Sequence, residues 1–330
     1  MTKISDIAFS IIVPVYNRPD EVAALLESLK NQTFKEFEVI IVEDGSSILS
    51  EKMCRNYMEM LNLKYFYKEN SGPGLSRNYG MQKASGNFFI ILDSDVVVPE
   101  TYMQIVYDEL IKDYTDAFGG PDAAAPDFTP IQKAINYAMT SWLTTGGIRG
   151  KGQKLDKFYP RSFNMGLSKK VFQHTGGFSA MRYGEDIDLS IRIMKAGFKT
   201  KLIPNAKVYH KRRNNWRSFY NQVKHSGEAR IVLSRLHPGT LKLWHFFPAI
   251  FTLGLILSLI LALFGLYTGI ILYSLYFIVL IIDATRQYKQ LKLGILSAIA
   301  AFVMLTGYGW GFLRQILQTR NRHNRIMASI

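Results

Sequence analysis

Cysteine, glycine-rich phosphate loops and charged residues are all scarce in this chain of 330 residues. Its single cysteine, Cys54, excludes a disulfide framework and a cysteine-rich metal cluster, and it fits a reducing cytosol. No Gly-x-Gly-x-x-Gly follows the first expected strand and no Gly-Lys-Ser/Thr loop occurs, so the usual dinucleotide-binding and P-loop classes lack their phosphate cradle. Disorder is also excluded, because 48% of the residues are hydrophobic and only 20% are charged.

The formal net charge of +14 arises entirely after residue 198. Residues 1–198 hold 22 basic and 24 acidic residues, whereas residues 199–242 hold 11 basic residues and one acid. Residues 286–330 add 7 basic residues and no acid. Because this surplus flanks an apolar segment, it predicts docking to anionic membrane lipids, and we expect no nucleic-acid partner.

The apolar segment between the two basic regions predicts a membrane domain. Residues 246–282 carry no charge. This uncharged segment is too long for one membrane helix of about 20 residues and long enough for two short ones. A second apolar run follows at residues 293–313. We therefore expect a boundary near residue 240, with residues 241–330 forming helices at about 246–265 and 268–283 and a third segment at about 293–313. Buried helices of a soluble protein are the disfavoured alternative.

The orientation of these segments follows from the flanking charges. Residues 1–6 are polar and the first apolar run is only strand-sized, so we expect no signal peptide and a cytosolic catalytic domain. The positive-inside rule agrees for the first two helices, making the protein a multi-pass protein of the inner (cytoplasmic) membrane. If the third segment spans, however, Arg314 and three later arginines lie outside. Its glycines at 307, 309 and 311 leave a re-entrant or interfacial segment as alternatives.

The first 100 residues alternate between β-branched strands and amphipathic helices. Strands are expected at 9–15, 37–42, 63–67 and 87–92, and helices from Pro19, over 51–61 and over 75–84. This alternation predicts an α/β fold with a parallel sheet covered by helices. Ligands bind such sheets at the carboxyl ends of the strands. Three of the expected strands end there in polar clusters, at Asn17, at Glu43-Asp44 and at Asp93-Ser94-Asp95.

Two acidic clusters carry the expected chemistry. Asp93 and Asp95 follow a very apolar strand, and a hard divalent cation binds such carboxylate oxygens while leaving positions open for phosphate. An acid pair that caps a loop or helix is the equally simple alternative. Glu185, Asp186 and Asp188 open a helix, where acids complement the helix dipole. Three acids exceed what a cap needs, so one of them is a candidate general base.

Six short motifs occur in a fixed order between residues 7 and 220. They are Val13-Pro14-Val15-Tyr16-Asn17, Glu43-Asp44-Gly45-Ser46, Arg77-Asn78-Tyr79-Gly80, Asp93-Ser94-Asp95, Asn164-Met165 and Gly184-Glu185-Asp186. Each motif alone is unspecific, but the ordered series resembles the family-two inverting glycosyltransferases. The resemblance implies a GT-A fold, which is a Rossmann-like nucleotide-sugar-binding α/β domain, here over residues 1–240.

The resemblance implies a role for each matching residue. Pro14 and Tyr16 would border the nucleotide base, and Asp44 would accept a hydrogen bond from the base N–H, which suits uracil or thymine. Arg77 would lie near the nucleotide and its diphosphate. Asp93 would contact the ribose or the metal.

The same resemblance assigns the metal and acceptor sides of the site. Asp95 would bind Mn²⁺ or Mg²⁺, Asp186 would be the general base, and Glu185 would lie beside it on the acceptor side. Asn164 would lie near the sugar. His210 would be a further metal ligand, although a lone histidine is more often structural.

Basic and aromatic residues after this histidine carry a separate expectation. Arg212, Arg213 and Trp216 would close over the diphosphate, because a guanidinium matches phosphate oxygens. A membrane-facing basic patch is the alternative for this stretch.

The resemblance implies a metal-dependent enzyme that moves a sugar from a nucleotide-sugar, of UDP or dTDP type, to a hydroxyl. The acceptor is expected to be a lipid-linked glycan at the cytosolic membrane face, in cell-surface polysaccharide assembly. A polyprenyl-phosphate glycosyltransferase is the nearest alternative, since its anionic acceptor needs no strong base. A processive synthase is disfavoured, because Arg213-Asn214-Asn215-Trp216 departs from Gln-x-x-Arg-Trp and three apolar segments are few for a pore. A non-catalytic binder would need neither the metal pair nor the base.

Overall fold

The computed structural model describes residues 7–123, 128–145, 158–210 and 213–327, with the side chains of residues 210 and 319–327 left aside. The chain divides into two compact units. The first comprises residues 1–125 and 155–211, and the second comprises residues 126–154 and 212–330. This division puts residues 212–240 with the apolar helices, whereas the sequence places the domain boundary near residue 240.

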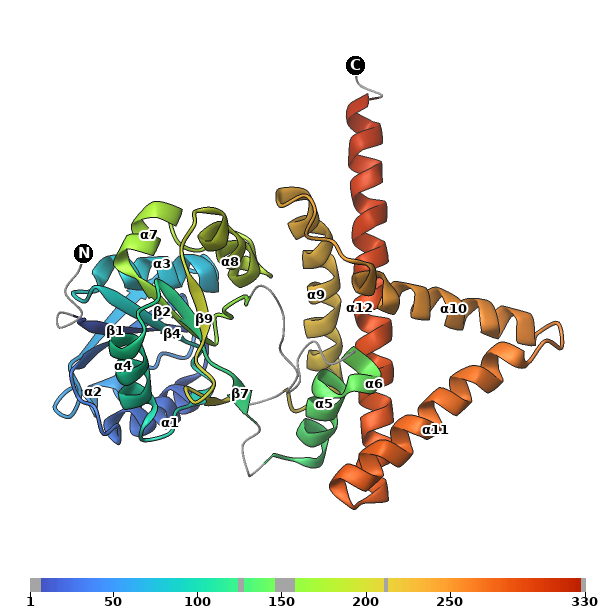
Figure 1. Ribbon diagram of the computed structural model, residues 1–330, viewed down its shortest axis with the longest axis horizontal. Helices are drawn as coiled ribbons and strands as arrows, with labels where there is room; N and C mark the ends of the chain where they lie inside the picture. Colours follow the sequence, from blue (N-terminus) through green and yellow to red (C-terminus); the bar gives the residue numbers. More distant parts are fainter. Residues whose placement is uncertain (1–6, 124–127, 146–157, 211–212, 328–330) are drawn as a thin grey trace. The chain divides into compact units, whose positions relative to one another are not determined.

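The first unit is built on a seven-stranded sheet in the order β3-β2-β1-β4-β8-β6-β9 (Figure 1). The strands are β1 (Phe9–Val15), β2 (Phe37–Asp44), β3 (Leu63–Lys68), β4 (Phe88–Leu92), β6 (Ala117–Gly119), β8 (Asn164–Ser168) and β9 (Thr200–Leu202). Strands β3, β2, β1 and β4 are parallel to their neighbours, as the alternation predicts. Strand β8, which lies beyond the four strands expected from the alternation, runs antiparallel to both β4 and β6, so the sheet is mixed.

Helices cover both faces of this sheet because successive strand residues point to opposite sides. Ile11, Val13 and Val15 pack with α1 (Pro19–Lys30) and α4 (Tyr102–Lys112). Ile12 packs on the other side with residues of α3 (Pro73–Lys83) and α8 (Glu185–Lys195). The remaining elements of the unit are α2 (Glu51–Arg55), α7 (Lys169–Thr175) and a small sheet of β5 (Val96–Val97), β10 (Val208–His210) and β7 (Asp122–Ala123).

Most expected element boundaries in this unit are confirmed to within two residues. The helix expected over 51–61 is the exception, because α2 ends at Arg55 and residues 56–60 form turns. Met58 and Met60 are 43% and 53% exposed, so the later part of that segment has no buried apolar face to hold a helix against the sheet.

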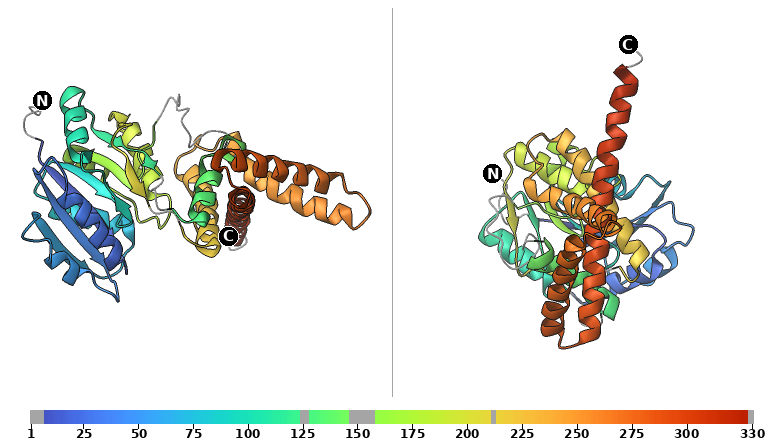
Figure 2. Two further views of the ribbon diagram at one scale, coloured as in Figure 1. Left: turned by 90° about the horizontal axis from the view of Figure 1, so that it is seen from below. Right: turned by 90° about the vertical axis from the view of Figure 1, so that its right-hand side faces the viewer.

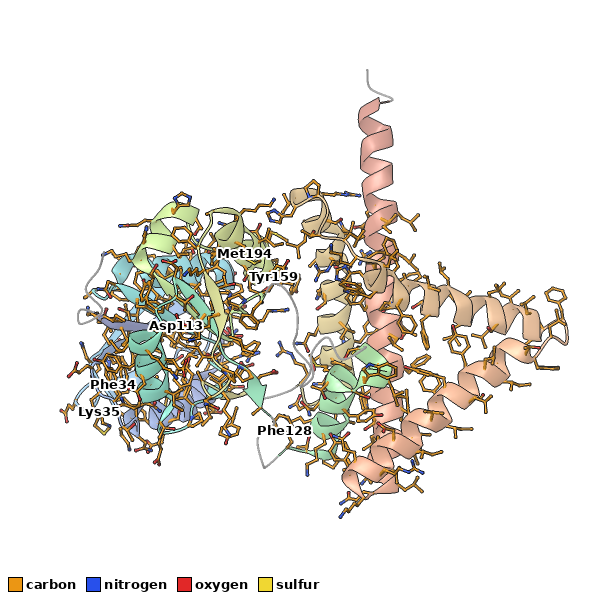
Figure 3. All side chains as sticks on the ribbon, viewed as in Figure 1. Phe34, Lys35, Asp113, Phe128, Tyr159 and Met194 are labelled. Atoms are coloured by element: carbon orange, nitrogen blue, oxygen red, sulfur yellow. The ribbon has the colours of Figure 1, made fainter. Side chains whose placement is uncertain are left out.

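The second unit is helical. Its elements are α5 (Pro130–Thr140), α6 (Trp142–Thr145), α9 (Trp216–Leu236), the 3₁₀ helix η2 (Leu243–Phe246), α10 (Phe247–Ala262), α11 (Thr268–Tyr288) and α12 (Leu291–Met327). Three segments are long and apolar enough to cross a membrane, namely Leu243–Ala262, Thr268–Tyr288 and Leu291–Gln318. Large apolar side chains of α10 and α11, such as Leu257 and Leu272, are exposed. Figure 3 shows side chains projecting from both helices.

Helix α12 is unbroken through its glycines at 307, 309 and 311. Gly307 and Gly311 are buried against α9, where a Cβ on Gly311 would overlap the carbonyl oxygen of Lys224. A Cβ on Gly227 of α9 would likewise overlap the carbonyl oxygen of Tyr308. The glycines therefore let the two backbones approach closely, which is the role small residues play between packed helices. Both views show α9 beside α12 (Figures 1 and 2).

Replacing Gly311 by valine is expected to force α9 and α12 apart. Overpacking of this kind costs about 1–3 kcal/mol, and it should lower the melting temperature of the detergent-solubilised protein by at least about 2 °C. Leu317→Ala is the control, since Leu317 is on the same helix and 61% exposed. Equal melting temperatures for Gly311→Val and Leu317→Ala would contradict the close contact.

Candidate active site

The polar clusters named above lie at the carboxyl ends of β1, β2 and β4. These three strands are adjacent and parallel, with Val15 opposite Glu43 and Ile12 opposite Ile91. The loops after them are tied together locally. The Asn17 side-chain oxygen accepts hydrogen bonds from the backbone N–H groups of Ser47 and Ile48, at 2.8 and 3.0 Å. The parallel part of the sheet thus brings residues from three distant motifs to one edge.

Asp44 ends β2 with its carboxylate buried and hydrogen-bonded. One oxygen accepts from the Lys68 ammonium at 2.7 Å and from the backbone N–H of Ser71 at 2.9 Å, and the other accepts from the N–H of Gly72 at 2.9 Å. An ionised carboxylate has about four acceptor positions, so these three bonds leave room for one more donor. A base N–H at this position stays a prediction.

Arg77 joins the two acidic clusters. One terminal nitrogen of its guanidinium donates to Asp93 at 2.7 Å, and the other donates to Glu185 at 2.9 Å. The Arg77 side chain is only 4% exposed and lies over the ring of Phe178. Helix α3 thereby holds the strand-end motif of β4 against the first residue of α8. The sequence places Arg77 near the diphosphate, whereas in the structure both terminal nitrogens of its guanidinium bond carboxylates of the protein.

Asp186, the expected base, is paired with Arg161. The Arg161 Nε donates to an Asp186 oxygen at 2.6 Å, and the N–H of Ile187 donates to the other oxygen at 2.8 Å. Burial alone would raise the pKa of Asp186, but the charge and hydrogen bond of Arg161 and the Ile187 N–H keep this pKa below its ordinary value. The carboxylate is therefore ionised at neutral pH, as a general base must be.

Glu185 differs from its neighbour in the direction of its pKa shift. Burial raises the pKa of Glu185, and the negative charge of Asp186 raises it further, while Arg77 opposes both effects. Two adjacent carboxylates therefore have pKa values shifted in opposite directions, which separates their chemical roles.

Asp95 forms an ion pair with Arg18. The guanidinium donates to an Asp95 oxygen at 2.5 Å, and the two side chains are 32% and 10% exposed. Sequence reasoning missed both Arg18 and Arg161. Their only sequence signal is position, because Arg18 directly follows the first strand-end motif and Arg161 lies three residues before Asn164.

The carboxylates of Asp93 and Asp95 suit a hard divalent cation in their chemistry. Both are oxygen donors two residues apart at the end of a buried strand, and the Asp93 side chain is 28% exposed. Each is paired with an arginine here, and no group of three or more metal-ligating side chains occurs among the described residues. A metal bound by this pair would therefore need further ligands, which the diphosphate of a donor could supply.

The other residues expected in the site differ in how far their side chains are exposed to solvent. Tyr16 is 54% exposed just beyond β1, while Pro14 is buried inside that strand. Asn164 is fully buried, its oxygen accepting from the Tyr102 hydroxyl at 2.7 Å and its amide donating to the carbonyl of Ala206 at 2.8 Å. The Asn164 side chain is thus used within the fold, so we do not propose a sugar contact for it.

The last four expected residues are His210, Arg212, Arg213 and Trp216. The backbone of His210 pairs with Val96 between β10 and β5, but its side chain is not described. Arg212 lies outside the described residues. Arg213 and Trp216 belong to the second unit, where Trp216 begins α9 and packs against its apolar core. Their contact with a diphosphate stays a prediction.

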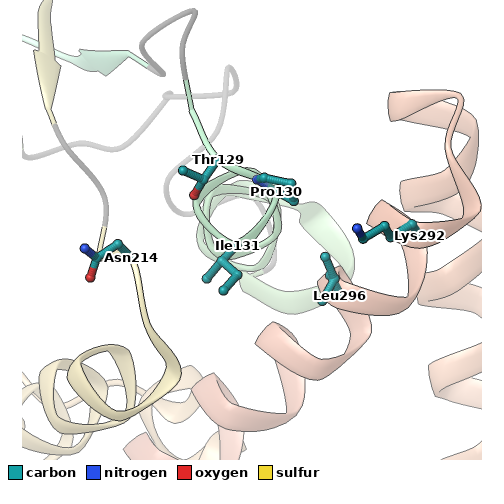
Figure 4. Close-up of a pocket in the computed structure, with 6 residues that line it drawn as sticks. All are labelled: Thr129, Pro130, Ile131, Asn214, Lys292 and Leu296. Carbon is teal, nitrogen blue, oxygen red and sulfur yellow. The ribbon is translucent and has the colours of Figure 1, made fainter.

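A cavity of about 420 Å³ lies in the second unit and is not the candidate active site (Figure 4). Its lining consists of Thr129, Pro130, Ile131, Asn214, Lys292 and Leu296. It contains one charged side chain and no carboxylate, so it offers neither a metal ligand nor a base. The chemistry lies in the acidic cluster of the first unit.

The sheet and its acidic edge define a GT-A-like nucleotide-sugar-binding fold. A family model described as glycosyl transferase family 2 matches residues 10–176, about half of the chain, and one described as glycosyl transferase family group 2 matches residues 158–286. The chain belongs to glycosyl transferase family 2.

Solved structures confirm the fold. The mannosyltransferase PcManGT from Pyrobaculum calidifontis, determined with GDP-Man and Mn²⁺, matches with a TM-score of 0.59 and 16% identity over 92% of this chain and 88% of its own. TarS 1–349 of S. aureus, determined with UDP, matches with a TM-score of 0.51 and 18% identity over 93% of this chain and 91% of its own.

Curated relatives are much longer than the matching region. The chondroitin synthase of Escherichia coli is 27% identical over 234 residues, which is 61% of this chain and 34% of that protein. The other curated relatives share smaller parts, such as 16% of one glycosyltransferase from Streptococcus pneumoniae. The chain therefore spans about a third or less of the length of these relatives.

Replacing Arg77 by alanine should leave the buried carboxylate of Glu185 and the partly exposed carboxylate of Asp93 without their shared partner. Breaking a buried ion pair in this way costs about 3–5 kcal/mol, so Arg77→Ala should sharply lower the free energy of unfolding or prevent folding. Arg55→Ala is the matched control, because Arg55 also pairs with a glutamate but is 70% exposed. Its effect should stay within about 1 kcal/mol. Similar losses of stability in the two variants by chemical denaturation would contradict the bridging role.

Proposed function

We propose that this protein is a metal-dependent inverting glycosyltransferase. It moves a sugar from a nucleotide-sugar, with UDP or dTDP types favoured, to a hydroxyl of a lipid-linked glycan at the cytosolic membrane face. The observation that carries the proposal is that Arg77 bonds both Asp93 and Glu185, and Glu185 is the neighbour in sequence of the expected base, Asp186. A catalytic domain at 1–240 and a membrane domain at 241–330 complete the proposal.

The donor would bind at the carboxyl ends of β1, β2 and β4. The exposed ring of Tyr16 offers a surface for the nucleotide base, and Asp44 keeps one acceptor position for a base N–H. Asp93 is the more exposed carboxylate after β4 and would contact the ribose or the metal. The proposed preference for uracil or thymine rests on this one remaining acceptor position of the Asp44 carboxylate.

Asp95 and Asp93 would hold the Mn²⁺ or Mg²⁺ ion, with His210 as a candidate further ligand. A bound divalent ion offsets the negative charge that builds on the leaving diphosphate. Arg18 now neutralises Asp95, so donor and metal binding requires this guanidinium to exchange Asp95 for another partner. A diphosphate oxygen matches that guanidinium.

Asp186 would take the proton of the acceptor hydroxyl as the hydroxyl oxygen attacks the anomeric carbon. The bond from that carbon to the diphosphate oxygen breaks on the opposite side, so configuration inverts and the nucleoside diphosphate leaves. Arg161 is 40% exposed, so it can turn aside or contact the acceptor while Asp186 accepts the proton. General-base catalysis of this kind is worth about 10²–10⁴-fold.

The charge and apolar patterns support a role at a membrane surface in cell-surface polysaccharide assembly. Three apolar segments could span a bilayer, and the second unit carries the basic surplus. One of the relatives is named chondroitin synthase, after the polysaccharide chondroitin. We therefore place the acceptor on a lipid carrier in the inner membrane.

The direct test is a screen of nucleotide-sugars with membrane extracts, with Mn²⁺ or EDTA, and mass analysis of the product. We expect a glycosidic product from a UDP- or dTDP-sugar, and we expect its formation to require the metal.

Replacing Asp186 by asparagine should reduce turnover at least about 10²-fold while UDP affinity stays within about twofold, because the amide cannot accept the proton. Asp116→Asn is the control, an acid outside this cluster. Near-normal turnover of Asp186→Asn would refute the base assignment, and a sugar–phosphate product would identify a polyprenyl-phosphate glycosyltransferase instead.

Arg161 should set the acidic limit of the pH profile. Its positive charge lowers the pKa of Asp186, so Arg161→Gln should raise that pKa and leave less ionised base at low pH. We expect the acidic limb of kcat/KM to move to higher pH in Arg161→Gln and to stay nearly in place in Arg161→Lys, which keeps the charge. An unchanged acidic limb in both variants would show that Arg161 does not tune the base.

A further inference from the structure

Helix α12 contacts both ends of the α10–α11 hairpin, at points far apart along its axis. A Cβ on Gly309 would overlap the carbonyl oxygen of Pro248, at the start of α10. A Cβ on Gly294 would overlap the hydroxyl of Thr285, near the end of α11. Gly294 and Gly309 are 15 residues apart in one continuous helix, which is about 22 Å along its axis.

The two ends of the hairpin should lie at one depth in a membrane. Lys242 precedes α10, and Arg286 and Lys289 end α11, so the positive-inside rule puts both ends at the cytosolic surface. Two points at one depth and about 22 Å apart on α12 define a direction parallel to that surface. In Figure 1 the turn between α10 and α11 lies away from α12, while the end of α11 packs on the start of α12, with the rings of Phe277 and Phe302 6.1 Å apart.

The face of α12 that packs on α9 is incompatible with a central position in a bilayer. Lys224 of α9 lies against Gly311, and Glu228 pairs with Arg314 at 3.5 Å. If α12 spanned from Leu291 to Gln318, its contact at Gly311 would lie about 10 Å from the midplane, inside the hydrocarbon. The charged residues of α9 would then sit in lipid, which is strongly unfavourable.

The rest of α12 presents an exposed apolar stripe. It is formed by residues that recur at helical spacing and are between 41% and 61% exposed, namely Ile295, Ile299, Phe302, Trp310 and Leu317. At about 100° per residue, the middle of this stripe points about 95° away from Gly307 and about 135° away from Gly311, the glycines that contact α9. Helix α12 therefore has an apolar face away from its charged neighbour, as helices in a membrane interface do.

We propose that α12 lies in the plane of the cytosolic membrane interface instead of crossing the bilayer. Its apolar stripe faces anionic lipid, α9 covers its water side, and the α10–α11 hairpin enters the membrane. This arrangement keeps Arg314 and the later arginines on the cytosolic side, so the positive-inside rule holds throughout the chain. The inference rests on the membrane location proposed above, but on neither donor nor acceptor.

Spin labels at three positions of the stripe test this orientation. The full chain, with the buried Cys54 replaced by alanine, would carry single cysteines at Ile295, Phe302 or Leu317 and be reconstituted into phosphatidylethanolamine–phosphatidylglycerol vesicles. The depth of each nitroxide is measured from its relative accessibility to oxygen and to a nickel chelate. We expect the three labels to be shallow and to agree in depth within about 5 Å, because the helix axis, at about 1.5 Å per residue, runs along the surface.

A spanning helix gives a different depth profile. Labels at 295 and 317 would then lie about 33 Å apart across the bilayer, with 302 much deeper than either. That profile, or full exposure of all three labels to the nickel chelate, would overturn the proposal. Labels at Ile250, Leu257 and Leu263, all exposed on or just after α10, are the control and should change in depth along the hairpin.

Two further readouts separate this inference from the proposed function. Co-flotation of the protein with the vesicles tests the membrane location itself, and failure to float would remove both the location and the orientation. Sugar transfer by the same labelled samples tests the enzyme, and its outcome does not alter the measured depths. Three labels at the same shallow depth, in a protein without transfer activity, would support the orientation of α12 and refute only the proposed function.

Discussion

The candidate active site depends on one buried guanidinium, that of Arg77. It holds the acid at the end of β4 and the acid at the start of α8 within reach of each other, although they are 92 residues apart in sequence. A buried charge is tolerated only when it is paired, so Arg77 and its two carboxylates require one another. Because Glu185 is the first residue of α8 and Asp186 the second, the same contact holds the end of the helix that carries the proposed base.

The site is acidic in sequence but neutralised pair by pair in the structure. Arg18 neutralises Asp95, and Arg161 neutralises Asp186. In the proposed reaction a metal and a diphosphate bring balancing charges of their own, so these pairs can exchange partners without leaving a charge buried alone. The opposite pKa shifts of Glu185 and Asp186 have the same origin, since each acid reflects its burial and its nearest arginine.

The second unit resolves a conflict that the charge pattern creates. Three spanning segments would place the basic end of the chain outside, against the positive-inside rule. Close packing of α9 on α12 through glycines, and the wide separation of the two hairpin ends along α12, favour a helix that lies along the membrane instead. In this view the basic α9 and the basic end of the chain share one cytosolic surface.

Local sequence determined much of this protein. The β-branched runs and their polar ends predict β1 to β4 and the strand-end acids, because strand periodicity and turn chemistry act over a few residues. The motif order indicated the family, which the family models confirmed. Tertiary structure alone decided the antiparallel insertion of β8, the bridge made by Arg77, the pairing of Arg18 and Arg161, and the burial of Asn164. These features join residues 16 to 108 positions apart, and no local pattern specifies which distant charge a buried carboxylate will meet.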